Sequence, residues 1–187
     1  MISRFLALLA ILMCLHGCTK AALIGDSITV FLGADAGEIN LAVPSKTTTE
    51  ILNEQLQPAL DSVPFAVAIL GGTNDLIQGR DSIEDLQAMA RTARAAGSCV
   101  ILATLPPCTG FLCPGAESFH EWDRKVLAFA YEERYPIADY HRLFIGHPEY
   151  QFDGVHPNAA GVAAMRSVLE PLIDACPNWA LAQRLSQ

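Results

Sequence analysis

The sequence has few basic residues, and they are not clustered. Its 187 residues contain 12 Lys and Arg against 20 Asp and Glu, which gives a formal net charge of −8. A surface that binds nucleic acid needs grouped Lys and Arg side chains to neutralise the phosphates. The sequence therefore argues against nucleic acid as a partner.

Repeats and segments of biased composition are also missing. The chain contains no internal repeat, no low-complexity segment and no linker, and its length suits one domain. No glycine-rich loop of the phosphate-binding kind follows the first predicted strand, residues 21–25. The residues that do follow it are Asp26 and Ser27.

The cysteines do not have metal-ligand spacing. Cys108 and Cys113 lie in the loop PPCTGFLCPG, and no second Cys or His pair stands at a spacing suited to zinc. We expect no metal and no other cofactor. In an oxidising compartment Cys108 and Cys113 could close a local disulfide, and a zinc site is the weaker alternative. Cys99 lies in an apolar segment and is interpreted as a core residue, while Cys176 is either free or paired.

The N-terminus has the pattern of an export signal. Arg4 precedes an apolar run over residues 5–15, which has the length of a signal-peptide core and is short for a bilayer span. Leu15-His16-Gly17-Cys18 resembles a bacterial lipobox, with His16 where a small residue is usual. We expect a signal peptide over residues 1–17, cleavage before Cys18, a periplasmic or cell-envelope protein tethered to the membrane through a lipid on Cys18, and one domain over 18–187. The alternative is an uncleaved anchor or an overextended start.

Beyond this segment, apolar runs of strand length alternate with helical patterns. Strands are predicted at residues 21–25, 38–42, 65–70, 100–105 and 137–138, and helices at 47–60, 82–96, 116–135 and 158–175. Continuous apolar strands separated by helices are typical of a parallel sheet covered on both faces. The pattern predicts a three-layer α/β/α sandwich and leaves the strand order open.

Three polar segments stand out against this background. Ser27 follows the first strand, Gly72-Thr73-Asn74-Asp75 follows the strand at 65–70, and Asp153-Gly154-Val155-His156 precedes the last helix. Each segment alone is explained by a turn or a helix cap. Ligands of open α/β sheets bind at the carboxyl ends of the strands, so we expect the three segments to meet there.

Together these segments contain the groups that acyl transfer needs. A serine hydroxyl becomes nucleophilic when a base takes its proton, and His156 is the candidate base for Ser27. Asp153 stands three residues earlier across a glycine turn, where its carboxylate can orient the imidazole. Asn74 and the Ser27 N–H are candidate donors to an oxyanion, with a third donor expected near Ala42. No similar paired setting is seen for the other histidines of the domain, His120, His141 and His147.

The three segments, in this order and at this separation, resemble those of SGNH (GDSL-type) hydrolases. Gly25-Asp26-Ser27, Gly72-Thr73-Asn74-Asp75 and Asp153-x-x-His156 match the family's blocks, whereas Ala42 stands where a glycine is expected. The resemblance implies a flavodoxin-like parallel sheet of order 2-1-3-4-5 and a metal-free serine esterase. It implies a Ser27–His156–Asp153 triad and an oxyanion hole formed by Ser27, Ala42 and Asn74.

We therefore expect an ester hydrolase that acts on short-chain or carbohydrate-linked acyl esters, because no lid-length insertion is present. Candidate pocket residues are Phe111, Leu112, Tyr140, Phe144, Tyr150 and Phe152. The alternative is a non-catalytic cell-envelope binding module on the same scaffold, which only the Ala42 departure supports. A flavodoxin-like protein that binds flavin or nucleotide fits the alternation of elements but lacks the phosphate loop. The sequence leaves the natural substrate and the oligomeric state open.

Overall fold

Five parallel strands form the central sheet in the order β2-β1-β3-β4-β5. The computed structural model describes residues 19–185, with side chains described through residue 176, so the predicted signal peptide (1–17) and Cys18 lie outside the described residues. The strands are β1 (Ala21–Gly25), β2 (Glu38–Asn40), β3 (Ala66–Leu70), β4 (Cys99–Ala103) and β5 (Ile137–Ala138). Every residue of β1, β3 and β4 is buried, as expected for a sheet covered on both faces.

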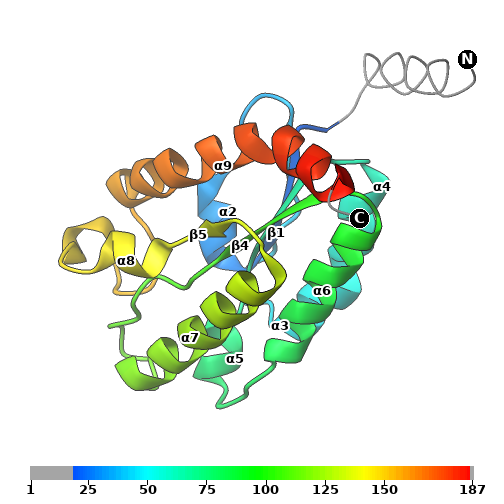
Figure 1. The fold of residues 1–187 in the computed structure, drawn as a ribbon. Helices are drawn as coiled ribbons and strands as arrows, with labels where there is room; N and C mark the ends of the chain where they lie inside the picture. Colours follow the sequence, from blue (N-terminus) through cyan, green and yellow to red (C-terminus); the bar gives the residue numbers. More distant parts are fainter. Residues whose placement is uncertain (1–18, 186–187) are drawn as a thin grey trace, which may run out of the picture.

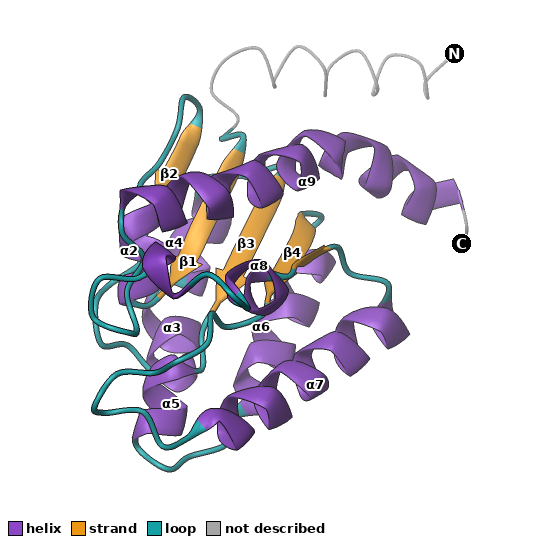
Figure 2. Ribbon diagram, turned by 90° about the vertical axis from the view of Figure 1, so that its left-hand side faces the viewer, coloured by secondary structure: helices purple, strands orange, loops and turns teal. Residues whose placement is uncertain are grey.

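Helices cover the two faces of this sheet (Figures 1 and 2). One face carries α2 (Ser27–Leu32), α8 (Tyr140–Phe144) and α9 (Ala159–Leu185). The other carries α3 (Thr48–Glu54), α4 (Leu56–Asp61), α6 (Ile83–Ala95) and α7 (Ala116–Glu133). The short α5 (Thr73–Ile77) directly follows β3, and the 3-10 turn η1 (Pro148–Tyr150) precedes the last polar segment. The predicted three-layer sandwich and its strand order are confirmed.

The helix predicted over residues 47–60 is divided in two. Thr47 and Glu50 form a capping box that starts α3, and the helical path breaks at Gln55 before α4 begins. The buried Gln55 amide turns to the end of β1, where its Oε1 accepts from the Gly25 N–H (2.8 Å) and its Nε2 donates to the Gly25 carbonyl (3.0 Å). The break thus fixes the backbone immediately before Ser27.

The C-terminal helix is longer than predicted. We expected it to end at residue 175, whereas α9 continues to Leu185. Cys99 is a buried core residue, as interpreted, and its disulfide with Cys176 joins this helix to β4. Cys108 and Cys113, for which the sequence left a disulfide open, are joined by one. None of the helices described in the structure is long and apolar enough to cross a membrane.

Candidate active site

Ser27 is the first residue of α2, at the point where β1 ends. Asp26 caps this helix, because its Oδ1 accepts from the Ile28 N–H at 2.9 Å. Gly25 is needed at the preceding position, since a Cβ there would lie 2.4 Å from the Leu70 carbonyl oxygen of β3. The cap, the close strand contact and the Gln55 amide together hold the Ser27 hydroxyl at the carboxyl edge of the sheet.

The turn from Asp153 to His156 brings the predicted base to this hydroxyl. Ser27 Oγ lies 2.8 Å from His156 Nε2, although the two residues are 129 positions apart in the chain. His156 Nδ1 lies 2.7 Å from Asp153 Oδ2. The second oxygen of Asp153 accepts from the backbone N–H of Val155 (2.9 Å) and of His156 (2.7 Å). Gly154, with φ 79°, allows this tight turn.

The pKa values of the two aspartates near Ser27 are shifted in opposite directions. Burial alone would raise the pKa of Asp153, but hydrogen bonds from the His156 backbone and ring and from Val155 outweigh it and lower the pKa. Asp26 is fully buried, and this burial raises its pKa to about 6 against the opposing effects of the Ile28 N–H and the Thr73 side chain. Asp153 is therefore the carboxylate that remains ionised over the wider pH range.

Asn74 and Asp75 have different tasks in the structure. Asn74 lies beside the serine on the wall of the same pocket, and its Nδ2 donates to the Lys46 carbonyl at 3.0 Å. Asp75 is fully buried and accepts from the Thr48 N–H and hydroxyl, both at 2.9 Å, which ties α5 to the start of α3. The structure thus separates a residue of the pocket wall from a structural carboxylate.

The loop after β2 places Ser45, and not Ala42, at the pocket. The Ala42 N–H donates to Asn40 Oδ1 at 3.0 Å, and Ala42 is not among the residues that line the pocket. Ser45 does line it, and its φ of 64° is in the left-handed region that favours glycine. The Ala42 N–H is thus occupied within its own loop, and Ser45 is the residue of this loop that lines the pocket. The capping box of Thr47 and Glu50 ends this loop two residues after Ser45 and starts α3.

A pocket of about 250 Å³ opens beside the serine. Its wall includes Phe111 and Leu112, as expected, and both side chains are largely exposed. Phe31 and Phe152 flank the His156 ring, with ring centroids 5.4 and 5.8 Å from it, and both are also exposed. Phe31 was missed in the sequence because it occupies an ordinary apolar position of α2.

The remaining predicted pocket aromatics lie elsewhere. Tyr140 and Phe144 belong to α8 and are buried. Tyr150 packs its ring on Phe144, with centroids 5.5 Å apart. None of these three lines the pocket beside Ser27.

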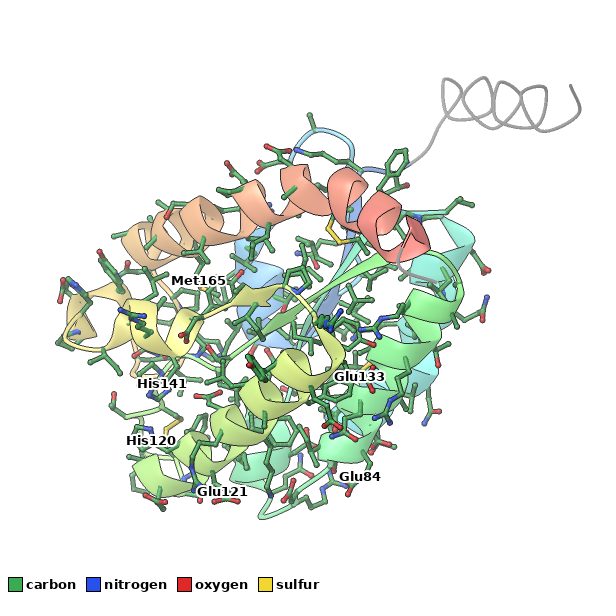
Figure 3. All side chains as sticks on the ribbon, viewed as in Figure 1. Glu84, His120, Glu121, Glu133, His141 and Met165 are labelled. Carbon is green, nitrogen blue, oxygen red and sulfur yellow. A yellow bond between two sulfur atoms is a disulfide. The ribbon has the colours of Figure 1, made fainter. Side chains whose placement is uncertain are left out.

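His156 is not the only histidine with a carboxylate partner. Asp123 Oδ2 lies 2.7 Å from His141 Nδ1, and Glu149 Oε1 lies 2.8 Å from His147 Nδ1, so the expectation for these histidines is wrong. Asp123 could not be identified from the sequence as the partner of His141, because it lies on α7, 18 positions before that histidine. Burial raises the pKa of Asp123 to about 7. His120, also on α7, faces His141 with ring centroids 4.8 Å apart (Figure 3).

The hydroxyl at its Nε2 distinguishes His156 from these histidines. The chemistry of a neutral imidazole between a hydroxyl and a carboxylate is proton transfer to and from the hydroxyl. Within the part of the chain that the structure describes, no group of three or more His, Cys, Asp or Glu side chains is arranged to hold a metal ion.

Comparisons with known proteins agree with this fold. A GDSL-like lipase from Bacteroides thetaiotaomicron is 20% identical and superposes with a TM-score of 0.73 over 82% of this chain and 87% of its own. A lipase/acylhydrolase from Enterococcus faecalis is 20% identical, with a TM-score of 0.70 over 84% and 96%. An acetyl xylan esterase is 14% identical, with a TM-score of 0.69 over 81% and 98%. No curated protein sequence matches the chain. The profile of the GDSL-like lipase/acylhydrolase family, however, matches residues 23–164, and the protein therefore belongs to this family of ester hydrolases.

Proposed function

We propose that the protein hydrolyses acyl esters through a nucleophilic Ser27, with His156 as general base and acid and Asp153 as the residue that orients His156. The chain of contacts from Ser27 Oγ through His156 to Asp153, at 2.8 and 2.7 Å, is the observation that carries the proposal. The lowered pKa of Asp153 supports its part, because an ionised carboxylate stabilises the imidazolium formed during proton transfer.

The reaction proceeds in two halves. Ser27 Oγ attacks the acyl carbonyl carbon while its proton moves to His156 Nε2, and the resulting tetrahedral intermediate expels the alcohol, which takes that proton. Water then attacks the acyl-serine, giving one proton to His156, and the collapse of the second intermediate returns a proton to Ser27 and releases the carboxylic acid. The protein ends each cycle unchanged.

The negative charge on the carbonyl oxygen needs hydrogen-bond donors that are already in place. We assign this task to the Ser27 N–H, the Asn74 amide and the backbone N–H of Ser45 in place of that of Ala42. The Ser27 N–H belongs to the first turn of α2, where helix N–H groups have no partner within the helix. Asn74 and Ser45 line the same pocket as the Ser27 side chain. The alternative hypothesis, a non-catalytic binding module, rested only on Ala42, and in this proposal Ala42 is not a donor.

Asn74→Ala is expected to lower kcat by about 10²- to 10³-fold, which corresponds to roughly 3–4 kcal/mol of transition-state stabilisation, with a much smaller change in KM. Asn53→Ala, on the exposed surface of α3, is the matched control and should leave kcat unchanged. Steady-state kinetics on a soluble acetyl ester measures both. An Asn74→Ala enzyme with the kcat of the wild type would remove this residue from the oxyanion hole.

We propose short-chain or carbohydrate-linked acyl esters as the substrate class. A pocket of about 250 Å³ accommodates a small acyl group, and the exposed rings of Phe31 and Phe152 offer apolar faces beside His156 to the alcohol portion. The structural neighbour described as an acetyl xylan esterase is consistent with this class. A panel of p-nitrophenyl esters should show kcat/KM highest for acetyl to butyryl chains, and a maximum at dodecanoyl or longer chains would contradict the proposal.

We also propose that the protein is exported and tethered through a lipidated Cys18, on the basis of the sequence of residues 1–18. In a bacterial host supplied with an alkyne fatty acid, the wild-type chain should carry the label and enter the membrane fraction. Cys18→Ser should lose both properties. An unlabelled wild-type chain in the soluble fraction would refute the tether.

A further inference from the structure

The catalytic turn, residues 152–156, is partly exposed, and its internal bonds do not fix its distance from Ser27. Asp153 accepts hydrogen bonds from Val155 and His156 within its own turn, and the Phe152 N–H donates to the His156 carbonyl at 3.2 Å. These bonds shape the turn. Its position over the sheet edge depends on what the rest of the chain packs against it.

A second loop provides part of that packing, beside the Phe31 ring of α2 that contacts Phe152 and His156. The Gly154 carbonyl accepts from the N–H groups of Thr109 (2.8 Å) and Gly110 (3.2 Å), which lie in the loop after β4. The backbones are in direct contact there. A Cβ on Gly154 would lie 2.7 Å from Gly110 N, and a Cβ on Gly110 would lie 2.9 Å from the Asp153 carbonyl oxygen. A small displacement of the loop is therefore passed on to the turn.

The Gln151 side chain connects the same two segments. Its Nε2 donates to the Pro107 carbonyl (2.9 Å) in the loop and to the Val155 carbonyl (3.0 Å) in the turn. One amide thus links the start of the loop to the residue next to His156. No reaction step proposed above uses Gln151.

The loop itself is held closed by the Cys108–Cys113 disulfide. Side-chain burial contributes little to this closure, because Phe111 is fully exposed at its tip and Leu112 is 67% exposed. The Cys113 N–H donates to the Gly110 carbonyl at 3.0 Å. Gly110, which contacts the catalytic turn, lies within the segment that the disulfide closes. Figure 3 draws this disulfide and the Cys99–Cys176 disulfide as yellow bonds.

We propose that the Cys108–Cys113 loop, together with Gln151, positions the catalytic turn, and that reduction of this disulfide switches the esterase to a low-activity state. The inference rests on the proposed roles of Ser27 and His156. While the disulfide is closed, the loop holds Gly154, and with it His156, at hydrogen-bond distance from Ser27. When it opens, the turn loses this support and the productive Ser27–His156 geometry becomes less populated.

The reductant is a dithiol, either a thioredoxin-like protein or dithiothreitol. A thiolate of the dithiol attacks the Cys113 sulfur, which belongs to a partly exposed residue, and Cys108 leaves as a thiolate. The second thiol of the reductant then displaces Cys113 and closes a new disulfide in the reductant. Both cysteines take up a proton, so two electrons and two protons pass to the enzyme. Cys99 and Cys176 are both buried, which shields the other disulfide from the same attack.

The two disulfides also differ in what they contribute to global stability. Cys108 and Cys113 are 5 positions apart, whereas Cys99 and Cys176 are 77 apart. The stabilisation that a disulfide gives by constraining the unfolded chain increases with the length of the closed loop. Loss of the short disulfide should therefore lower activity and leave Tm nearly unchanged. Loss of the long disulfide should lower Tm and leave activity nearly unchanged.

The test compares the double variant Cys108→Ser/Cys113→Ser with the wild-type enzyme and with Cys99→Ser/Cys176→Ser. We expect kcat for a soluble acetyl ester to fall by about 10- to 100-fold in the first variant, as for a small misplacement of a catalytic group, with KM changed much less and Tm nearly retained. The rate at which a fluorophosphonate labels Ser27 should fall in parallel. The Cys99→Ser/Cys176→Ser variant should have a lower Tm and, below that Tm, the wild-type kcat.

Wild-type enzyme treated with dithiothreitol should lose activity as mass spectrometry detects free Cys108 and Cys113, and reoxidation should restore it. Gln151→Ala should lower kcat in the oxidised enzyme and shift its pH profile, whereas Gln57→Ala on the exposed side of α4 should not. These two measurements decide the question even if the double cysteine variant does not fold. Full activity with the disulfide open, or a loss that occurs only together with unfolding, would overturn the proposal.

Fluorophosphonate labelling distinguishes a failure of this positioning role from a failure of the proposed function. If Ser27 is not the nucleophile, the fully oxidised wild-type enzyme remains unlabelled by the fluorophosphonate. If only the positioning role is wrong, the oxidised and reduced enzymes are labelled at Ser27 at equal rates.

Discussion

Ser27→Ala is expected to reduce ester hydrolysis by about 10⁴-fold or more while the protein remains folded. The substitution removes the oxygen that would form the acyl-enzyme, and no other hydroxyl is placed at 2.8 Å from His156 Nε2 among the described residues. The alanine side chain fits the same space, and alanine is a good helix former at the start of α2. We therefore expect Tm to change by only a few degrees.

Ser167→Ala provides the control for this experiment. Ser167 lies on the exposed side of α9, where its hydroxyl donates to the Ala164 carbonyl one turn earlier. Its replacement should leave kcat and KM at the wild-type values. Initial rates on p-nitrophenyl acetate and thermal unfolding of both variants give the comparison, and a Ser27→Ala protein that retains a tenth of the wild-type kcat would exclude Ser27 as the nucleophile.

Asp153→Asn is expected to lower kcat by about 10⁴-fold. Asparagine can offer its NH₂ group to His156 Nδ1, which would turn the ring into the tautomer that carries its proton on Nε2 and cannot accept from Ser27. The negative charge that stabilises the imidazolium is lost as well. Because the folded turn lowers the pKa of Asp153, the wild-type carboxylate remains ionised at pH values below neutral, and the deficit of the variant should persist from pH 6 to pH 8.

The same lowered pKa sets the sign of the contribution of Asp153 to stability. A carboxyl group whose pKa is lower in the folded state stabilises the fold above its unfolded pKa of 3.8, and this contribution is lost as the pH falls through the folded value.

Asp61→Asn, at the exposed end of α4, is the matched control for charge removal in the kcat experiment and should leave kcat unchanged. An Asp153→Asn enzyme within tenfold of the wild-type kcat would show that His156 does not depend on this carboxylate.

The sequence alone predicted the strands and helices whose apolar residues follow a local pattern. The apolar runs at β1, β3 and β4 and the helical spacing in α6 and α7 follow from burial on one or two faces, and all five elements are present. Asp153 and His156 lie within one turn, so their pairing was also visible locally. The contact between Ser27 and His156 spans 129 positions, and its prediction depended on the convergence of strand ends and on the resemblance to SGNH hydrolases.

Polar groups that pair across the fold were not predictable in this way. Gln55 occupies a helical position in the pattern, and only the folded chain shows that it breaks the helix to bind Gly25. The same holds for Asp123 with His141 and for Cys99 with Cys176, since each pair joins two different elements. The loop after β2 is another case, because the Asn40 side chain accepts from the Ala42 N–H and the residue that lines the pocket is Ser45, three positions later.

Covalent labelling of the oxidised enzyme with a fluorophosphonate tests the central claim most directly, because the reagent reacts with a serine whose proton is accepted by a neighbouring base. We expect a single phosphonylated residue, Ser27, by peptide mass spectrometry, with labelling abolished in Ser27→Ala and strongly slowed in His156→Ala. A folded, ester-hydrolysing enzyme that carries the label on a different residue, or that remains unlabelled, would contradict it.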